Sequence, residues 1–473
     1  MARPAAAQPN MECGHRHHRC RTACRPGCRG LCRLDPAAQS PHHIPRLLLL
    51  NMRGLYSIGI ALAWWLLRAA SAFGHRKARL AVRGRHGWMA RIQAAKATAI
   101  ATGKTGRWLH VHCASVGEYE QAAPLLDALA AQAPNRPILL TFFSPSGREA
   151  ITESAADHID YLPWDGASET RRFAVLLDPE DTVLIKYELW PNLLRALGQH
   201  GTRIHLVAAR FDRGRHPMNG WGWWVRQHLA TLDSLHVQDA ASQSTLAEFG
   251  LSCSVTGDPR ADRVLQALDR PMHPVVQETL QRIEAWKGER QLLLIGSGWP
   301  GEWDALRIAR ENWPAGWAFV MVPHDITGAS VDAWCSEADV VRTSECASGA
   351  FQEATGLVLD QMGCLRDAYR LADLAIVGGG WRAGVHNTLE PAAHGLPVAV
   401  GPKAEGFREI AGLHDAGALT IHLHPGGLAD WIAEWTRTEH EVQRREAGQA
   451  AKAWVLAHRG AADRIVSALL AKS

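Results

Sequence analysis

The chain has 473 residues, which at roughly 150 residues per domain predicts two or three domains and a core that needs no disulfides. Hydrophobic residues make up 47% and charged residues 21%, which is typical of globular proteins and excludes a collagen-like, wholly disordered or polytopic membrane protein. The net charge of +4 comes from basic residues before Gly87, so the rest of the chain is acidic and a nucleic-acid partner is not expected.

Residues 1–51 have a composition unlike that of a folded domain. They carry eight arginines against only Glu12 and Asp35, and they lack a periodic hydrophobic pattern. Cysteines and histidines are mixed in this stretch, but their spacing fits no standard zinc pattern. We expect a disordered extension or a misassigned start ahead of Met52, with a metal site as the weaker alternative.

An apolar segment, LYSIGIALAWWLLRAASAF at 55–73, follows Met52 and is interrupted only by Arg68. A helix of about 19 residues is just long enough to cross a bilayer, and a helix lying in the membrane interface is equally compatible. A buried core helix is the alternative. We expect 52–86 to form a membrane anchor with a basic collar that keeps the following domain on the cytoplasmic side.

From Gly87 onward, short apolar runs alternate with helix-like stretches, which is the pattern of parallel α/β proteins. We predict two Rossmann-like, doubly wound domains facing a cleft, at 87–268 and 269–473, joined by a polar link at 269–274. Ligands of such sheets bind beyond the carboxyl ends of the strands. The predicted strands are WLHVHCAS, PILLTFF, TVLIKYE and RIHLVAAR in the first domain, and QLLLIGSG, WAFVMVP, ADLAIVGGG and LPVAVGP in the second.

Two predicted strand ends in the first domain carry charged residues. Glu118 begins the helix after the strand that ends at His112, where a carboxylate serves either as a general base or simply as a favourable partner of the helix dipole. Lys186 and Glu188 end another strand, as an ion pair that caps the sheet or as part of a site. Their position in an α/β fold favours a site.

The strongest local signal in the second domain is the glycine-rich stretch from Gly378 to Gly384, followed by Asn387 and Glu390 at a predicted helix start. Such loops suit phosphate groups, and Glu390 can accept hydrogen bonds from ribose hydroxyls. The spacing matches neither the dinucleotide fingerprint nor a Walker sequence. The sequence has no tight cluster of metal-ligand type, so we expect neither a metal nor a cofactor.

Together these segments resemble the bacterial 3-deoxy-D-manno-octulosonic acid (Kdo) transferases, which are membrane-associated glycosyltransferases of the GT-B fold. The resemblance runs from about Leu55 to the C-terminus. It is carried by motifs that occur in the family's order, namely HCASVGE at 112–118, FSPSG at 143–147, YELWPNLL at 187–194, TGDPRAD at 256–262, DQMGCLRDAY at 360–369 and GVHNTLEPAA at 384–393.

The resemblance implies transfer of Kdo from CMP-Kdo to a lipid A precursor in lipopolysaccharide assembly, at the cytoplasmic face of the inner membrane. It makes Glu118 the base, sets Lys186 and Glu188 beside the reaction centre, and gives Arg260 the place of a lysine that stabilises the transition state. It also implies metal-independent transfer with inversion. The residues that it assigns to CMP binding are Pro323, His324, Met362, Gly363, Cys364, Asn387, Thr388, Leu389 and Glu390.

Three of these positions depart from the family pattern. Lys186 stands where many members carry a glutamate, His324 replaces an arginine, and Cys364 replaces a glutamate. The departures leave two alternatives open. One is a GT-B transferase with another nucleotide sugar or lipid acceptor, and the other is a non-catalytic, membrane-bound nucleotide-binding homologue.

Overall fold

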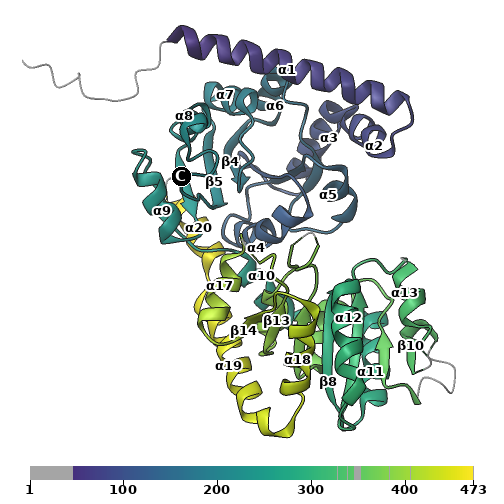
Figure 1. Cartoon of the computed structure of the whole chain (residues 1–473). Helices are drawn as coiled ribbons and strands as arrows, with labels where there is room; N and C mark the ends of the chain where they lie inside the picture. Colours follow the sequence, from purple (N-terminus) through teal and green to yellow (C-terminus); the bar gives the residue numbers. More distant parts are fainter. Residues whose placement is uncertain are drawn as a thin grey trace, which may run out of the picture. The chain divides into compact units, whose positions relative to one another are not determined.

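A computed structural model describes residues 46–327, 329–337, 339–345, 353–382, 384–404 and 406–471 (Figure 1). The chain divides into two units, Met1–Met52 and Arg53–Ser473, and both β-sheets belong to the second unit. The prediction for the N-terminal extension lies outside the described residues as far as residue 45.

A parallel seven-stranded sheet forms the first Rossmann-like fold, with the strand order β3-β2-β1-β4-β5-β6-β7. β1 pairs with both β2 and β4, and Val111 lies opposite Leu140 and Val183. These strands are buried along almost their whole length because helices cover both faces of a parallel sheet. The strands are β1 (Trp108–Cys113), β2 (Ile138–Phe142), β3 (His158–Tyr161), β4 (Pro179–Ile185), β5 (Arg203–Ala209), β6 (Ser234–Val237) and β7 (Ser254–Val255).

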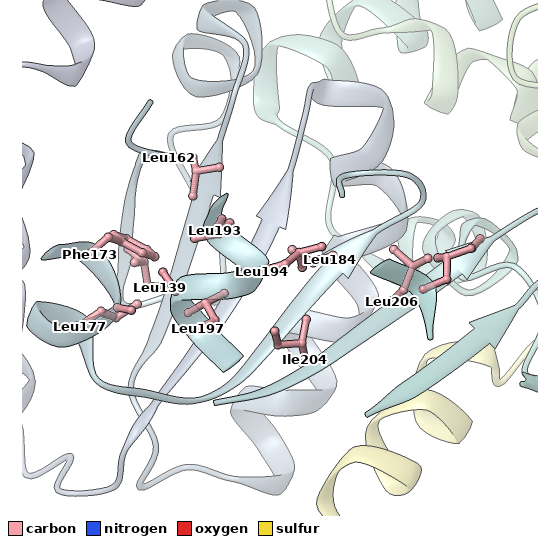
Figure 2. Packing of buried hydrophobic residues seen from close by; sticks show 14 of the residues in the cluster. Leu139, Leu162, Phe173, Leu177, Leu184, Leu193, Leu194, Leu197, Ile204 and Leu206 are labelled. Carbon is pink, nitrogen blue, oxygen red and sulfur yellow. The ribbon is translucent and has the colours of Figure 1, made fainter. Parts of the chain in front are cut away.

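Apart from the helix that precedes β1, the helices of this half follow the strands in alternation, as a doubly wound fold requires. Phe173, Leu193 and Leu197 project from two of them into one buried cluster with Leu139, Leu184 and Leu206 of the sheet (Figure 2). Burial of each such side chain stabilises the fold by roughly 1.5–3 kcal/mol. The helices are α3 (Trp88–Ala101), α4 (Val116–Gln132), α5 (Pro145–Ala150), α6 (Ala167–Leu177), α7 (Pro191–His200), α8 (Trp223–Leu229), α9 (Ala240–Ala247) and α10 (Arg260–Asp269), with the 3-10 turn η1 (Gly220–Gly222).

The second sheet is also parallel and seven-stranded, with the order β10-β11-β9-β8-β12-β13-β14. Its central strand β8 pairs with β9 and β12, where Leu294 lies opposite Val320 and Ala375. The predicted fold class, two Rossmann-like sheets in one chain, is therefore confirmed. The strands are β8 (Gln291–Gly298), β9 (Trp317–Pro323), β10 (Val340–Arg342), β11 (Gly356–Val358), β12 (Leu374–Val377), β13 (Val398–Val400) and β14 (Leu419–Ile421).

Helices flank the second sheet on its faces, with α12 and α18 packed against each other (Figure 1). The helices are α11 (Pro274–Lys287), α12 (Pro300–Ala309), α13 (Ala329–Trp334), α15 (Leu365–Ala368), α16 (Leu389–Ala393), α17 (Arg408–Asp415), α18 (Pro425–Trp435), α19 (Glu441–Ala457) and α20 (Ala461–Leu470). Short 3-10 turns are η2 (Arg310–Asn312), η3 (Thr343–Glu345), η4 (Tyr369–Leu371) and η5 (Thr438–His440).

The last helix, α20, packs against the first sheet although it follows the second in sequence. Ile465 and Val466 of α20 share a buried cluster with Leu109 of β1. Asp262 of α10 accepts a hydrogen bond from the backbone N–H of Ala462 at 2.8 Å, which fixes the start of the helix. The first Rossmann-like fold is thus completed by the end of the chain.

Two further helices, α1 (Arg46–Ala72) and α2 (Arg76–Arg85), precede α3 and the first sheet. The predicted apolar helix is present, and over Met52–Ala72 it is long and apolar enough to cross a membrane by length and composition alone. None of that window is buried inside the molecule, which is consistent with a membrane anchor. The basic collar folds into α2, whose first turn is capped by His75.

Candidate functional site

The turn between β1 and α4 holds Glu118 in a capping box. The Glu118 carboxylate oxygen Oε2 accepts from the Ser115 backbone N–H at 3.0 Å and from the Ser115 hydroxyl. This capping box gives Glu118 a structural role at the helix start, where the sequence offered only a favourable interaction with the helix dipole as the alternative to a general base. The other oxygen, Oε1, accepts no hydrogen bond from any residue in the described part of the chain, so it remains available to a substrate hydroxyl.

Glu188 lies at the carboxyl end of the neighbouring strand β4. Its oxygen Oε2 accepts from the Trp190 indole N–H at 2.9 Å and lies 3.5 Å from His112 Nε2. Burial, and then the charges of Glu118 and Glu188, raise the pKa of the Cys113 thiol well above its usual range. The two carboxylates predicted from separate motifs therefore lie near the same buried thiol.

Lys186 follows β4 in a left-handed backbone conformation, with φ of 61°. Its N–H donates to the Val207 carbonyl at 2.9 Å, which holds the strained residue at the strand end. Among the described residues Lys186 forms no ion pair, with Glu188 or any other acid. A backbone outlier at the end of a central strand is typical of functional sites.

Arg260, at the start of α10, is fully engaged by two carboxylates. Its guanidinium donates to Asp258 Oδ2 at 2.7 and 2.9 Å and to the Glu409 oxygens at 2.8 and 3.1 Å. Glu409 belongs to α17, so this arginine joins the end of the first fold to a helix of the second. Its charge is therefore balanced inside the protein by these two carboxylates.

In the second fold, Glu302 ties α12 to the glycine-rich turn after β12. Its Oε2 accepts from the Trp299 N–H at 3.0 Å and its Oε1 from the Gly379 N–H at 3.1 Å. Gly378 fits there only without a side chain, since a Cβ atom would lie 2.2 Å from the Ser297 carbonyl oxygen. Gly378 therefore serves close backbone packing, and the phosphate-binding role of the loop stays a prediction.

His324 stacks on Trp299, with ring centroids 4.4 Å apart, and lies 4.7 Å from the ring of His386. The Arg382 guanidinium lies 5.4 Å from the Trp299 ring. Within the described residues, Trp299 Nε1, His386 Nε2 and Thr388 Oγ1 are buried without a hydrogen-bond partner. Unsatisfied buried polar atoms are uncommon in native proteins, and here they surround the end of the second sheet where a ligand is expected.

The remaining residues that were predicted to bind CMP have different surroundings. Pro323 ends β9, Met362 is 77% exposed, and the Cys364 thiol is buried in the core, so that thiol faces away from solvent. Glu390 accepts from the Asn387 side-chain amide at 3.2 Å. Gly363 and Leu389 complete the set, with Gly363 in a turn of positive φ and Leu389 as the first residue of α16.

Burial raises the pKa of Glu302 from 4.5 to about 7. In the unfolded chain this carboxyl loses its proton near pH 4.5, so between these values the folded state binds more protons and the free energy of unfolding falls as pH rises. Above about pH 7 the effect levels off. We expect Glu302→Gln to remove on the order of 3 kcal/mol of this pH dependence. Chemical unfolding of the wild-type protein and the variant between pH 5 and 8 measures the free energy of unfolding as a function of pH. The same pH dependence in both proteins would contradict the raised pKa of Glu302.

Several residues of the site were not found from the sequence. Trp299 and Glu302 lie in GSGWPGE at 296–302, which repeats the strand, small-residue turn and Gly-Glu helix start of HCASVGE. This similarity between the two stretches is the signal from which Trp299 and Glu302 could have been predicted. Glu409 lies in FREI at 407–410, which also resembles a motif of the family, but its contact with Arg260 joins distant parts of the sequence and was not predicted.

The described residues contain no group of three or more histidine, cysteine or acidic side chains placed to hold a metal ion. The site chemistry visible in this part of the chain therefore consists of carboxylates, imidazoles, guanidinium groups and backbone N–H groups. Such a set can move a proton and hold an anion.

Comparison with known proteins identifies relatives over most of the chain. Residues 82–263 match the family model described as 3-Deoxy-D-manno-octulosonic-acid transferase (kdotransferase). The 3-deoxy-D-manno-octulosonic acid transferase of Bordetella pertussis is 30% identical over 445 residues, covering 88% of this chain and 98% of that protein. The enzyme of the same name from Haemophilus influenzae is 26% identical over 380 residues, covering 76% and 86%.

Solved structures share the architecture at low identity. The UDP-GlcNAc 2-epimerase of Neisseria meningitidis, bound to UDP-GlcNAc, aligns with a TM-score of 0.56 and 12% identity, covering 77% of this chain and all of that one. A putative UDP-N-acetylglucosamine 2-epimerase from Listeria monocytogenes aligns with a TM-score of 0.51 and 15% identity, covering 77% and 96%. These similarities support the fold alone.

Proposed function

The chain belongs to the 3-deoxy-D-manno-octulosonic acid transferase family and is a glycosyltransferase, and on this premise we propose that it transfers Kdo from CMP-Kdo to the lipid A precursor lipid IVA. The observation that carries the proposal is the placement of Glu118 and Glu188 after the carboxyl ends of adjacent strands, where Glu118 caps the helix that follows β1 and Glu188 lies 3.5 Å from His112 Nε2 of β1. A glycosyl transfer needs a base for the acceptor hydroxyl at such a position.

Glu118 acts as the base through its unbonded oxygen Oε1. As the acceptor hydroxyl loses its proton to this carboxylate, its oxygen attacks the anomeric carbon of Kdo from one side. The bond from that carbon to the CMP phosphate oxygen breaks on the other side, so CMP leaves and the configuration inverts. Glu188, held by the Trp190 N–H and near His112, keeps the local potential negative and orients the acceptor.

The leaving CMP requires positive charge and hydrogen-bond donors. Arg382 and the imidazoles of His324 and His386 lie together at the end of the second sheet, with the unpaired Trp299 N–H beside them. Glu390 and Asn387 face the ribose in this proposal. Arg260 lies where the two folds meet, and in this proposal it contacts the phosphate while Asp258 and Glu409 hold its guanidinium in place. These groups make a metal unnecessary for the departure of the phosphate.

We further propose that α1 lies in the plane of the inner membrane, on its cytoplasmic face. Tyr56 donates to Asp165 at 2.7 Å, and the Trp164 indole donates to the Ile60 carbonyl at 2.9 Å, so one side of α1 is bound to the first fold. The other side exposes a row of large apolar residues that suits a single leaflet. These residues are Leu55, Ile58, Leu62, Trp65 and Leu66.

To test the proposal, membranes that contain the protein are incubated with CMP-Kdo and tetraacylated lipid IVA, with and without EDTA. The mass of the glycolipid is then measured by mass spectrometry. We expect the acceptor to gain the mass of one or more Kdo units, equally in both samples, because no step depends on a divalent ion. A gain that EDTA abolishes would contradict metal independence. No gain, with CMP binding intact, would point to another sugar or acceptor.

A further inference from the structure

A cavity of about 370 Å³ lies between the inner side of α1 and the first fold. α1 contributes Ile60, Ala61 and Trp64 to its lining, while Trp88 at the start of α3 and Trp164 after β3 form the opposite wall. Its volume falls within the range of small-molecule binding sites. The cavity is distinct from the sheet ends that carry the predicted catalytic residues.

The charged side chains in the cavity wall are already satisfied. Arg85 donates to the Leu162 carbonyl at 2.9 Å and to the Phe143 carbonyl at 2.7 Å. Glu169 accepts from the Trp88 indole N–H at 3.1 Å. What the cavity offers a ligand is therefore apolar and aromatic surface, which fits an alkyl chain and not a sugar or a nucleotide.

Aromatic side chains connect this cavity to the predicted reaction centre. The ring centroids of Trp64 and Trp164 are 5.1 Å apart, those of Trp164 and Phe143 are 5.8 Å apart, and those of Phe143 and Trp190 are 4.6 Å apart. All four are partly exposed. The last of them donates to the Glu188 carboxylate, so the row begins at α1 and ends at a predicted site residue.

We propose that the cavity binds one acyl chain of the glycolipid acceptor, and that the aromatic row guides the acceptor from the membrane to Glu188. The inference rests on the proposed function for its acceptor. A chain in the cavity would lie against the inner side of α1, one helix diameter (~10 Å) from the exposed apolar row on the other side of that helix. A phospholipid that only stabilised the fold would not require an aromatic row that ends at the Glu188 carboxylate. The row therefore favours the glycolipid acceptor as the occupant.

The matched test uses two variants of α1. Ala61→Phe enlarges a side chain of the cavity lining, whereas Ala63→Phe adds the same side chain to the same helix outside that lining, and both alanines are exposed. The KM for tetraacylated lipid IVA is compared with the KM for its deacylated, water-soluble disaccharide. We expect Ala61→Phe to raise the KM for the acylated acceptor about tenfold or more and to leave the deacylated one unchanged. Ala63→Phe should change neither.

Equal effects of Ala61→Phe on both acceptors, or no effect on either, would overturn the proposal. A second measurement is independent of turnover, namely cross-linking by lipid IVA or a phospholipid with a photoreactive acyl chain, mapped by mass spectrometry. We expect the glycolipid to label the peptide containing Trp164, and Ala61→Phe to prevent it. Labelling by the phospholipid alone would make the cavity a bilayer-lipid site and refute the acceptor role. If wild-type protein transfers nothing yet is labelled by lipid IVA, the proposed reaction fails while the binding site stands.

Discussion

Glu118→Gln is expected to lower kcat for transfer by about 10²- to 10⁴-fold, which is the usual contribution of a general base. The variant is informative because glutamine preserves the capping box with Ser115, so α4 keeps its N-terminal hydrogen bonds. Only the ability to take the acceptor proton is lost. Rates measured with saturating CMP-Kdo and lipid IVA, with CMP affinity measured in parallel, check this result.

The control is Asp127→Asn, which removes a carboxylate from the same helix where it pairs with Arg270 at an exposed site. We expect this variant to transfer at the wild-type rate, because exposed ion pairs contribute little. Full activity of Glu118→Gln would reduce Glu118 to a helix cap. A parallel loss of thermal stability and rate would also argue against the base role.

Arg260→Met is expected to destabilise the protein by about 3–5 kcal/mol, because it leaves two largely buried carboxylates without their counter-charge. Asp258 and Glu409 both bind this guanidinium, and the Glu409 side chain is only 5% exposed. The variant should also transfer about 10²- to 10³-fold more slowly if the arginine stabilises charge on the leaving phosphate. Unfolding in denaturant and single-turnover rates measure the two effects separately.

A double variant separates the structural role of Arg260 from the chemical one. Arg260→Met with Glu409→Gln removes one of the stranded carboxylates, so we expect much of the lost stability to return while transfer stays slow. Recovery of both would make the arginine a purely structural link between α10 and α17. Arg260→Lys keeps the charge but loses the paired geometry, and we expect it to retain most of the transfer rate.

The sequence predicted the central parts of both sheets well. All eight predicted strands are present, because continuous runs such as LLLI and AFVMV are typical of buried parallel strands. The strands that were missed lie toward the sheet edges. Some of the missed strands are polar, such as β3 with the sequence HIDY. Others, such as β10 and β14, have only three residues. Neither a periodic pattern nor a long apolar run marks such strands.

The site was predictable where a motif lies at a strand end. Glu118 and Glu188 follow neighbouring strands, so a parallel fold brings them to one edge. The contact of Arg260 with Glu409 and the stacking of Trp299 on His324 depend on tertiary packing, which no local pattern encodes. Cys364 was assigned to binding of the CMP-sugar donor from a motif alone. Its thiol faces the core, and contact between this position and the donor stays a prediction.

The packing of α20 against β1 has a consequence for how the protein is made. Ile465 and Val466 belong to the core of the first fold, yet they are synthesised after all the strands of the second sheet. At roughly 5–20 residues per second, the first sheet waits on the order of ten seconds or more for its final helix. During that time α1 is already synthesised, so the apolar helix can reach the membrane before the domain it serves has finished folding.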